Sequence, residues 1–107
     1  MELFEDSTPK DVLDYADELI RGVKERRGEI DSILQASSQN WKVERMAIVD
    51  RNVLRLAVFE MKFGSSPLKP SIAINEAVDI AKKFGTTDSG SFVNGLLDQV
   101  RRQAGWE

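Results

Sequence analysis

Apolar residues recur at helical spacing along most of this chain, and they do not alternate with a period of two over any useful length. Spacings of three and four residues predict amphipathic helices, whereas the missing alternation argues against strands. A length of 107 residues with 41% hydrophobic content suits one domain with a modest core. The sequence therefore predicts an all-α fold, a compact helical bundle of about five to six helices in a single domain over residues 1–107.

Start and stop signals divide the first half of the chain. Thr8 can cap free amides and Pro9 suits the first helical position, so a helix is expected from here with an apolar stripe between residues 12 and 23. The polar run 24–28 weakens the stripe, and residues 30–34 form either a continuation or a short second helix. A polar turn over residues 37–40 then precedes a short helical segment that begins at Trp41.

The second half contains three further expected helices. Asp50 stands where an N-cap belongs, before a helix that is apolar around much of its girth and is therefore expected to be central. Pro70 and Gly85 bound the next helix. Asp88 or Ser89 begins the last one, whereas residues 101–107 show no clear pattern.

Composition and charge exclude several function classes. The chain has no cysteine and no histidine, which removes thiolate chemistry and the commonest general base and metal ligand. With no paired acids placed for acid–base work, we expect neither an enzyme nor a metal or cofactor site. The net charge of −3 is asymmetric: residues 1–40 carry ten acids and five bases, and residues 41–107 carry eight acids and ten bases. An anionic partner should prefer the second part.

Several polar residues interrupt the apolar helical patterns. Arg51 and Arg55 lie four residues apart beside Asp50, which indicates either a solvated helix start or a contact for a partner protein. Asn75 lies in an apolar context that predicts a structural hydrogen-bond tie, and Glu76 next to it is expected in the first turns of its helix, near the positive end of the dipole. The pair Asn94 and Gly95 lies within the final helix, where close helix packing would compensate for the glycine.

Three residues have both a structural and a binding interpretation. Phe92 is either a core residue or an exposed ring on which a base of single-stranded RNA could stack. Lys82 and Lys83 offset the dipole at a helix C-terminus, or they belong to the rim of an anion site. A surplus of two bases in this half cannot by itself supply the phosphate contacts that dominate nucleic-acid affinity.

Three segments in order closely resemble the NusB family. They are LRLAVFE at residues 54–60, INEAVDIAKKFG at 74–85 and FVNGLLD at 92–98, within a best-matching core over residues 41–100. The resemblance implies an all-helical transcription antitermination factor that pairs with NusE, a small-subunit ribosomal protein. It also implies that the pair binds boxA RNA, chiefly of ribosomal RNA operons.

The resemblance carries over to particular residues. Asp50 and the adjacent helix, with Arg51 and Arg55, resemble the surface that meets NusE. Asp88, Ser89 and Phe92 resemble the loop and helix start beside the RNA, with Lys82 and Lys83 nearby. The N-terminal sequence shows neither an apolar signal core nor an Arg-rich transit pattern, so a cytoplasmic protein is expected. No apolar run is long enough to span a bilayer, so no membrane partner is expected.

The chain departs from the family at its N-terminus. The family normally begins with an Arg-rich helix that contacts RNA and a second helix, and neither is recognisable here, so RNA binding is expected to be weakened or lost. The same departure leaves the stripe at residues 12–23 uncovered and predicts self-association through it. Two alternatives stay open: an accessory RNA-binding domain like that of an RNA cytosine methyltransferase family, or a protein-interaction remnant without RNA affinity.

Overall fold

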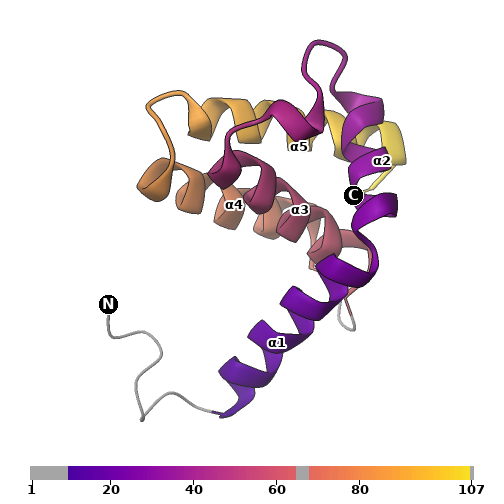
Figure 1. Ribbon diagram of the computed structural model, residues 1–107, viewed down its shortest axis with the longest axis vertical. Helices are drawn as coiled ribbons and strands as arrows, with labels where there is room; N and C mark the ends of the chain where they lie inside the picture. Colours follow the sequence, from indigo (N-terminus) through magenta and orange to yellow (C-terminus); the bar gives the residue numbers. More distant parts are fainter. Residues whose placement is uncertain (1–9, 65–67, 107) are drawn as a thin grey trace.

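The fold is all-α, as the sequence predicts (Figure 1). The computed structural model describes residues 10–64 and 68–106, with the side chains of residues 10–13 and 15 left out. These residues form five α-helices and one 3-10 helix: α1 (Lys10–Glu25), α2 (Arg27–Ser37), η1 (Val43–Arg45), α3 (Ile48–Lys62), α4 (Pro70–Phe84) and α5 (Ser89–Ala104). None of the described helices is both long enough and apolar enough to cross a membrane.

Helix α3 lies at the centre of the fold, as its apolar girth predicts, and it contacts each of the other four α-helices. Its Leu54 and Val58 are fully buried, together with Val93 and Leu97 from α5. Helices α4 and α5 pack against each other and against α3, while α2 packs against α3 and α5. Burying each such side chain contributes roughly 1.5–3 kcal/mol, so this shared core is the main source of stability.

Helix α1 extends away from the other helices toward the N-terminus (Figure 1). It contacts α3 at Gly22, where a Cβ atom would lie 2.1 Å from the Phe59 ring, so this contact requires a glycine. Leu19 and Val23 pack at the edge of the core, whereas Ile20 is 56% exposed. From residue 16 onward, the apolar stripe of α1 is therefore covered along one side only.

Several predicted helix boundaries are confirmed and others are wrong. Pro70 opens α4 and Gly85 follows its last residue, as expected. The polar run near residue 26 separates α1 from α2, and the segment after Trp41 is helical only over Val43–Arg45. Asp50 is not an N-cap: Ala47 precedes α3 and Asp50 lies in its first turn. The expected start at residues 8 and 9 lies outside the described residues.

The final helix continues further than the sequence pattern indicates. Helix α5 runs to Ala104, and Gly105 ends it in the left-handed conformation, with φ at 73°. The next residue, Trp106, donates its backbone N–H to the Arg101 carbonyl oxygen and packs against the core. The glycine thus turns the chain so that a single tryptophan anchors it, which helical spacing alone does not reveal.

Candidate binding site

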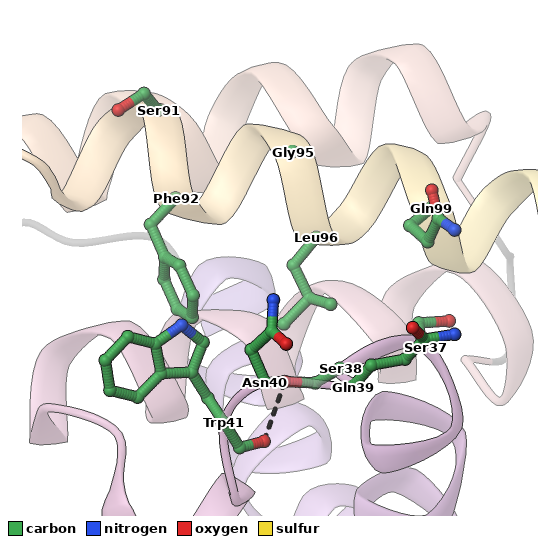
Figure 2. Close-up of a pocket in the computed structure, with 10 residues that line it drawn as sticks. All are labelled: Ser37, Ser38, Gln39, Asn40, Trp41, Ser91, Phe92, Gly95, Leu96 and Gln99. Atoms are coloured by element: carbon green, nitrogen blue, oxygen red, sulfur yellow. Dashed lines mark hydrogen bonds between the residues drawn. The ribbon is translucent and has the colours of Figure 1, made fainter.

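Two polar side chains fix the loop that presents Trp41. The amide nitrogen of Gln35 donates to the backbone oxygens of Ser38 and Trp41, at 3.0 Å each, and its oxygen accepts the N–H of Val43 at 3.0 Å. The Ser38 hydroxyl donates to the Trp41 carbonyl oxygen at 2.7 Å (Figure 2). The Trp41 side chain nevertheless stays in solvent, because the residue is 61% exposed. The sequence pattern predicts a polar turn over residues 37–40 and a helical segment from Trp41, and it does not reveal that the Trp41 ring is exposed at a pocket.

A pocket of about 320 Å³ lies between this loop and α5. In Figure 2 the rings of Trp41 and Phe92 and the amide of Asn40 point into the space between the two elements. We call it the amide pocket, and its lining residues are Ser37, Ser38, Gln39, Asn40, Trp41, Ser91, Phe92, Gly95, Leu96 and Gln99. None of these ten residues is charged. Aromatic rings combined with neutral donors and acceptors suit a flat heterocycle such as a nucleobase.

Gly95 forms part of the open wall of the amide pocket. The predicted close helix packing at this position is wrong, because no atom of another described helix lies within 4 Å of where a Cβ would stand. Its neighbour Asn94 is exposed on α5. Gly95 therefore leaves room for a ligand and not for another helix.

The other two predicted structural residues lie on the surface of α4. Asn75 is exposed, and no hydrogen bond of its side chain to another described residue supports the predicted tie. Glu76 is also exposed and lies beyond the first turn of α4, because the helix begins at Pro70. The predicted stabilisation by the helix dipole is therefore wrong, since that effect is confined to the first turn.

A second pocket, of about 230 Å³, shares Trp41 and Phe92 with the first. We call it the acidic pocket, and its lining residues are Trp41, Arg45, Met46, Ala47, Asp50, Thr86, Asp88 and Phe92. Asp50 is only 8% exposed, and its Oδ1 is buried without a hydrogen-bond partner among the described residues. Phe92 is half-buried and packs against the core, so both interpretations of this residue apply: its ring packs inside and also forms a wall of both pockets.

The two arginines predicted beside Asp50 have internal roles. Arg55 is 7% exposed and forms a two-pronged ion pair with Asp31 of α2, with distances of 2.8 Å from Nε to Oδ1 and 2.9 Å from a terminal nitrogen to Oδ2. Arg51 donates to the backbone oxygen of Glu44 at 3.0 Å. The prediction of Arg55 as a solvated or partner-binding residue is therefore wrong, because packing of α2 on α3 encloses it.

The residues predicted to contact RNA near the turn between α4 and α5 have different positions: some stabilise the turn and others face a pocket. Ser89 is 1% exposed, and its hydroxyl accepts the Thr86 N–H at 2.9 Å, so it stabilises the turn and is not free to bind a ligand. Asp88 is exposed and lines the acidic pocket. The stem of Lys82 lies across Gly90, whereas Lys83 is exposed in the last turn of α4. Of these residues, Asp88 and Phe92 are brought together at one pocket.

The chemistry of this surface is that of a binding site. Among the described residues, no group of three acidic, histidine or cysteine side chains is placed to hold a metal ion. Both pockets are open, and they share the aromatic rings of Trp41 and Phe92. The amide pocket has a neutral lining, and the acidic pocket has a charged one. The arrangement offers surfaces for stacking and hydrogen bonding from the loop after α2, the start of α3 and the start of α5.

Comparison with known proteins agrees with this geometry. The sequence model of the NusB family matches residues 2–102. The transcription antitermination protein NusB of Bdellovibrio bacteriovorus is 63% identical over 100 residues, which cover 94% of this chain and 74% of that protein. The NusB of Desulforapulum autotrophicum is 47% identical over 98 residues, covering 92% of this chain and 68% of that protein.

A solved structure extends the likeness to the fold. The structure of T. maritima NusB superposes with a TM-score of 0.85 and 38% sequence identity, covering 95% of this chain and 71% of that one. The match to the family's sequence model spans both the loop at Trp41 and the start of α5. From the family match, the high identities and the common fold, we conclude that this chain belongs to the NusB family.

Proposed function

We propose that this chain acts in transcription antitermination by binding NusE and single-stranded boxA-type RNA. The observation that carries the proposal is the position of Phe92 and Asp88, which resemble the family's RNA-side residues, at two pockets that share the exposed ring of Trp41. An exposed indole beside neutral amides can stack on one base and hydrogen-bond to its edge. The first turn of α3, with Asp50, is then the protein-facing side of the same surface.

Charge supports a shared role for the two partners. Lys82 and Lys83 lie at the end of α4 next to the start of α5, and Arg45 lines the acidic pocket, which gives this surface few cations for phosphate contacts. Because phosphate contacts supply much of the affinity for RNA, we expect weak RNA binding by the chain alone and stronger binding with NusE. The role is one of binding and not catalysis, and bacterial transcription places it in the cytoplasm.

A fluorescence titration tests the proposal. Labelled boxA-like single-stranded RNA is titrated with the chain, with and without purified NusE, at two salt concentrations. We expect binding that strengthens with NusE and weakens with salt, and a loss of roughly 5-fold to 100-fold in Trp41→Ala, because stacking contributes about 1–3 kcal/mol per base. Phe84→Ala is the matched control, since Phe84 is 68% exposed but lines neither pocket. NusE binding without RNA binding would identify a protein-interaction module instead.

We further propose that the chain self-associates through the uncovered side of α1. A groove of about 130 Å³ beside this helix is lined by Leu19, Val53, Leu56, Ala57, Glu60, Glu76, Ala77 and Ile80. Ile20 on α1 is 56% exposed and Ile80 at the groove is 42% exposed. Light scattering over a concentration series should show dimers that Ile80→Lys, an exposed change in the groove, abolishes and Ile48→Lys, an exposed change outside the groove, does not. A monomer at every concentration would refute this proposal.

A further inference from the structure

The acidic pocket contains a buried carboxylate oxygen that accepts no hydrogen bond from the described residues. Asp50 is more than nine-tenths buried, and its Oδ1 has no donor among the described residues. It also forms no ion pair with any described lysine or arginine. The adjacent Arg51 donates from a terminal nitrogen to the backbone oxygen of Glu44, and its own Nε is buried without a partner among the described residues, so it does not satisfy Asp50. A buried acceptor left in this state is destabilising until a donor reaches it, so the pocket favours a ligand rich in N–H groups.

The walls around Asp50 add apolar and aromatic surface. Met46 and Ala47 line the pocket on the chain preceding α3, and the rings of Trp41 and Phe92 line it from the loop and from α5. Such walls accept a methylene stem, and an exposed indole face attracts a cation. The pocket therefore suits a long side chain that is apolar along its length and cationic at its tip.

The charges of the lining select against a phosphate. Asp50 and Asp88 supply two negative charges, and Arg45 supplies one positive charge, so the eight lining residues sum to −1. A phosphate group would meet this negative field next to a buried carboxylate, whereas a cation would be attracted by it. The adjoining amide pocket has no charged lining residue and lacks this preference.

We propose that the acidic pocket receives an arginine side chain from the protein partner, with its guanidinium on the Asp50 carboxylate and its stem along Met46 and Ala47. The identification of this partner as NusE rests on the proposed function. The preference of the pocket for an arginine side chain follows from its lining and does not depend on that function. Guanidinium is planar and weakly hydrated, presents two parallel N–H donors to a carboxylate, and stacks on aromatic faces. Lysine offers a strongly hydrated point charge without that planar fork, so it satisfies the pocket less well.

The first test measures the affinity of the chain for purified NusE by calorimetry. Asp50→Asn should weaken binding by roughly tenfold to a hundredfold, the range for loss of a hydrogen bond to a charged group. Asp79→Asn is the matched control: it removes an exposed acid of α4 outside both pockets, and its affinity should stay within about twofold of the original. Equal affinities of the original chain and Asp50→Asn for NusE would overturn the proposal. Circular dichroism checks that both variants are folded.

A second test uses small probes and does not depend on NusE. N-acetyl-arginine amide, its neutral isostere N-acetyl-citrulline amide, N-acetyl-lysine amide and guanosine monophosphate are titrated into isotope-labelled chain and followed by amide NMR shifts. We expect the arginine probe to shift Asp50 and the Trp41 indole more than the citrulline and lysine probes, and Asp50→Asn to remove that difference. Equal shifts by arginine and citrulline, or shifts by the nucleotide alone, would overturn the proposal. If NusE does not bind at all, the proposed function fails while this test still decides the occupant of the pocket.

Discussion

The ion pair between Arg55 and Asp31 offers the sharpest test of how this fold is held together. Arg55 comes from the central helix α3, and its side chain is only 8% exposed, whereas that of Asp31 on α2 is 30% exposed. Replacing Asp31 with asparagine keeps the shape of the side chain but leaves the guanidinium buried beside a neutral amide. Arg27, at 3.9 Å from Asp31 and with a 63% exposed side chain, cannot take over the role of Asp31 because it carries the same charge as Arg55.

The expected cost follows from the burial of the two partners. Removing one member of a fully buried pair costs about 3–5 kcal/mol, because the remaining charge is left unpaired. Since Asp31 is partly exposed and water can reach the vacated side, we expect Asp31→Asn to lower the free energy of unfolding by about 2–3 kcal/mol. Against a total of about 5–15 kcal/mol for a typical domain, this is a large loss.

Urea unfolding followed by circular dichroism measures the effect. The midpoint should fall by roughly 1–2 M, given the usual dependence of the unfolding free energy on urea. Asp17→Asn is the matched control, because the Asp17 and Arg21 side chains are 57% and 73% exposed and their pair, at 3.0 Å, should contribute about 0.5 kcal/mol or less. An Asp31→Asn loss no greater than that of the control would refute the reasoning.

A double variant separates the unpaired charge from the lost contact. If the cost arises from leaving Arg55 without a partner, Asp31→Asn combined with Arg55→Met should be more stable than Asp31→Asn alone, because the buried charge is then gone. If instead the cost arises from weaker packing of α2 on α3, the second change would add to the first. The urea midpoint of the double variant distinguishes the two origins.

Three further predictions concern glycines and pH. Gly22→Ala should destabilise the fold by about 1–3 kcal/mol in urea unfolding, because its methyl group meets the buried Phe59 ring. Gly95→Ala should instead raise the free energy of unfolding by about 0.5–1 kcal/mol, since its methyl group meets no atom and alanine is the better helix former; a loss would contradict the open wall. The hydrogen bond from Arg101, with smaller effects of nearby charges, holds the pKa of Asp98 below its usual value. Because the folded pKa is the lower one, the stabilisation is full above the unfolded pKa and is lost as pH falls through the folded pKa. Asp98→Asn should therefore be less stable than the original chain at pH 7, and the two stabilities should converge in acid below about pH 4.

The sequence predicts the helices well because helix formation is encoded locally. Proline at the start of α4 and glycine at its end act on their own backbone neighbours, and the girth of apolar residues in α3 requires contacts on several sides. The errors occur where the deciding contact is distant in the chain. The extent of α5 depends on Trp106 packing against the core, and the position of Asp50 depends on where the turn before α3 ends.

The candidate site shows more clearly the difference between features set by the local sequence and features set by contacts that are distant in the chain. Sequence spacing finds polar residues in apolar patterns, but it cannot tell whether a neighbour encloses them. Arg55 and Ser89 become internal ties because Asp31 and Thr86 lie beside them in space. Gly95 opens onto a pocket because no other described residue fills the space above it. Trp41 was absent from the predicted site because its exposure depends on Gln35 and Ser38 fixing the backbone of its loop.

These contacts explain why binding and stability are separable on this surface. The residues that hold the helices and loops in place form their hydrogen bonds within the chain; they are Gln35, Arg55 and Ser89. Of the residues that face the pockets, Trp41 keeps an exposed ring, and Asp50 keeps a carboxylate oxygen with no partner among the described residues. Replacing a member of the first group should loosen the backbone that its hydrogen bonds hold. Because both pockets are built on that backbone, the binding of every partner should weaken together. Replacing Trp41 or Asp50 should leave the urea midpoint near that of the original chain. Because Trp41 lines both pockets, its loss should weaken both partners, whereas Asp50→Asn should weaken the protein partner alone. Variants of both groups, compared for stability and for each partner, would show whether the two pockets act as independent sites on one rigid frame.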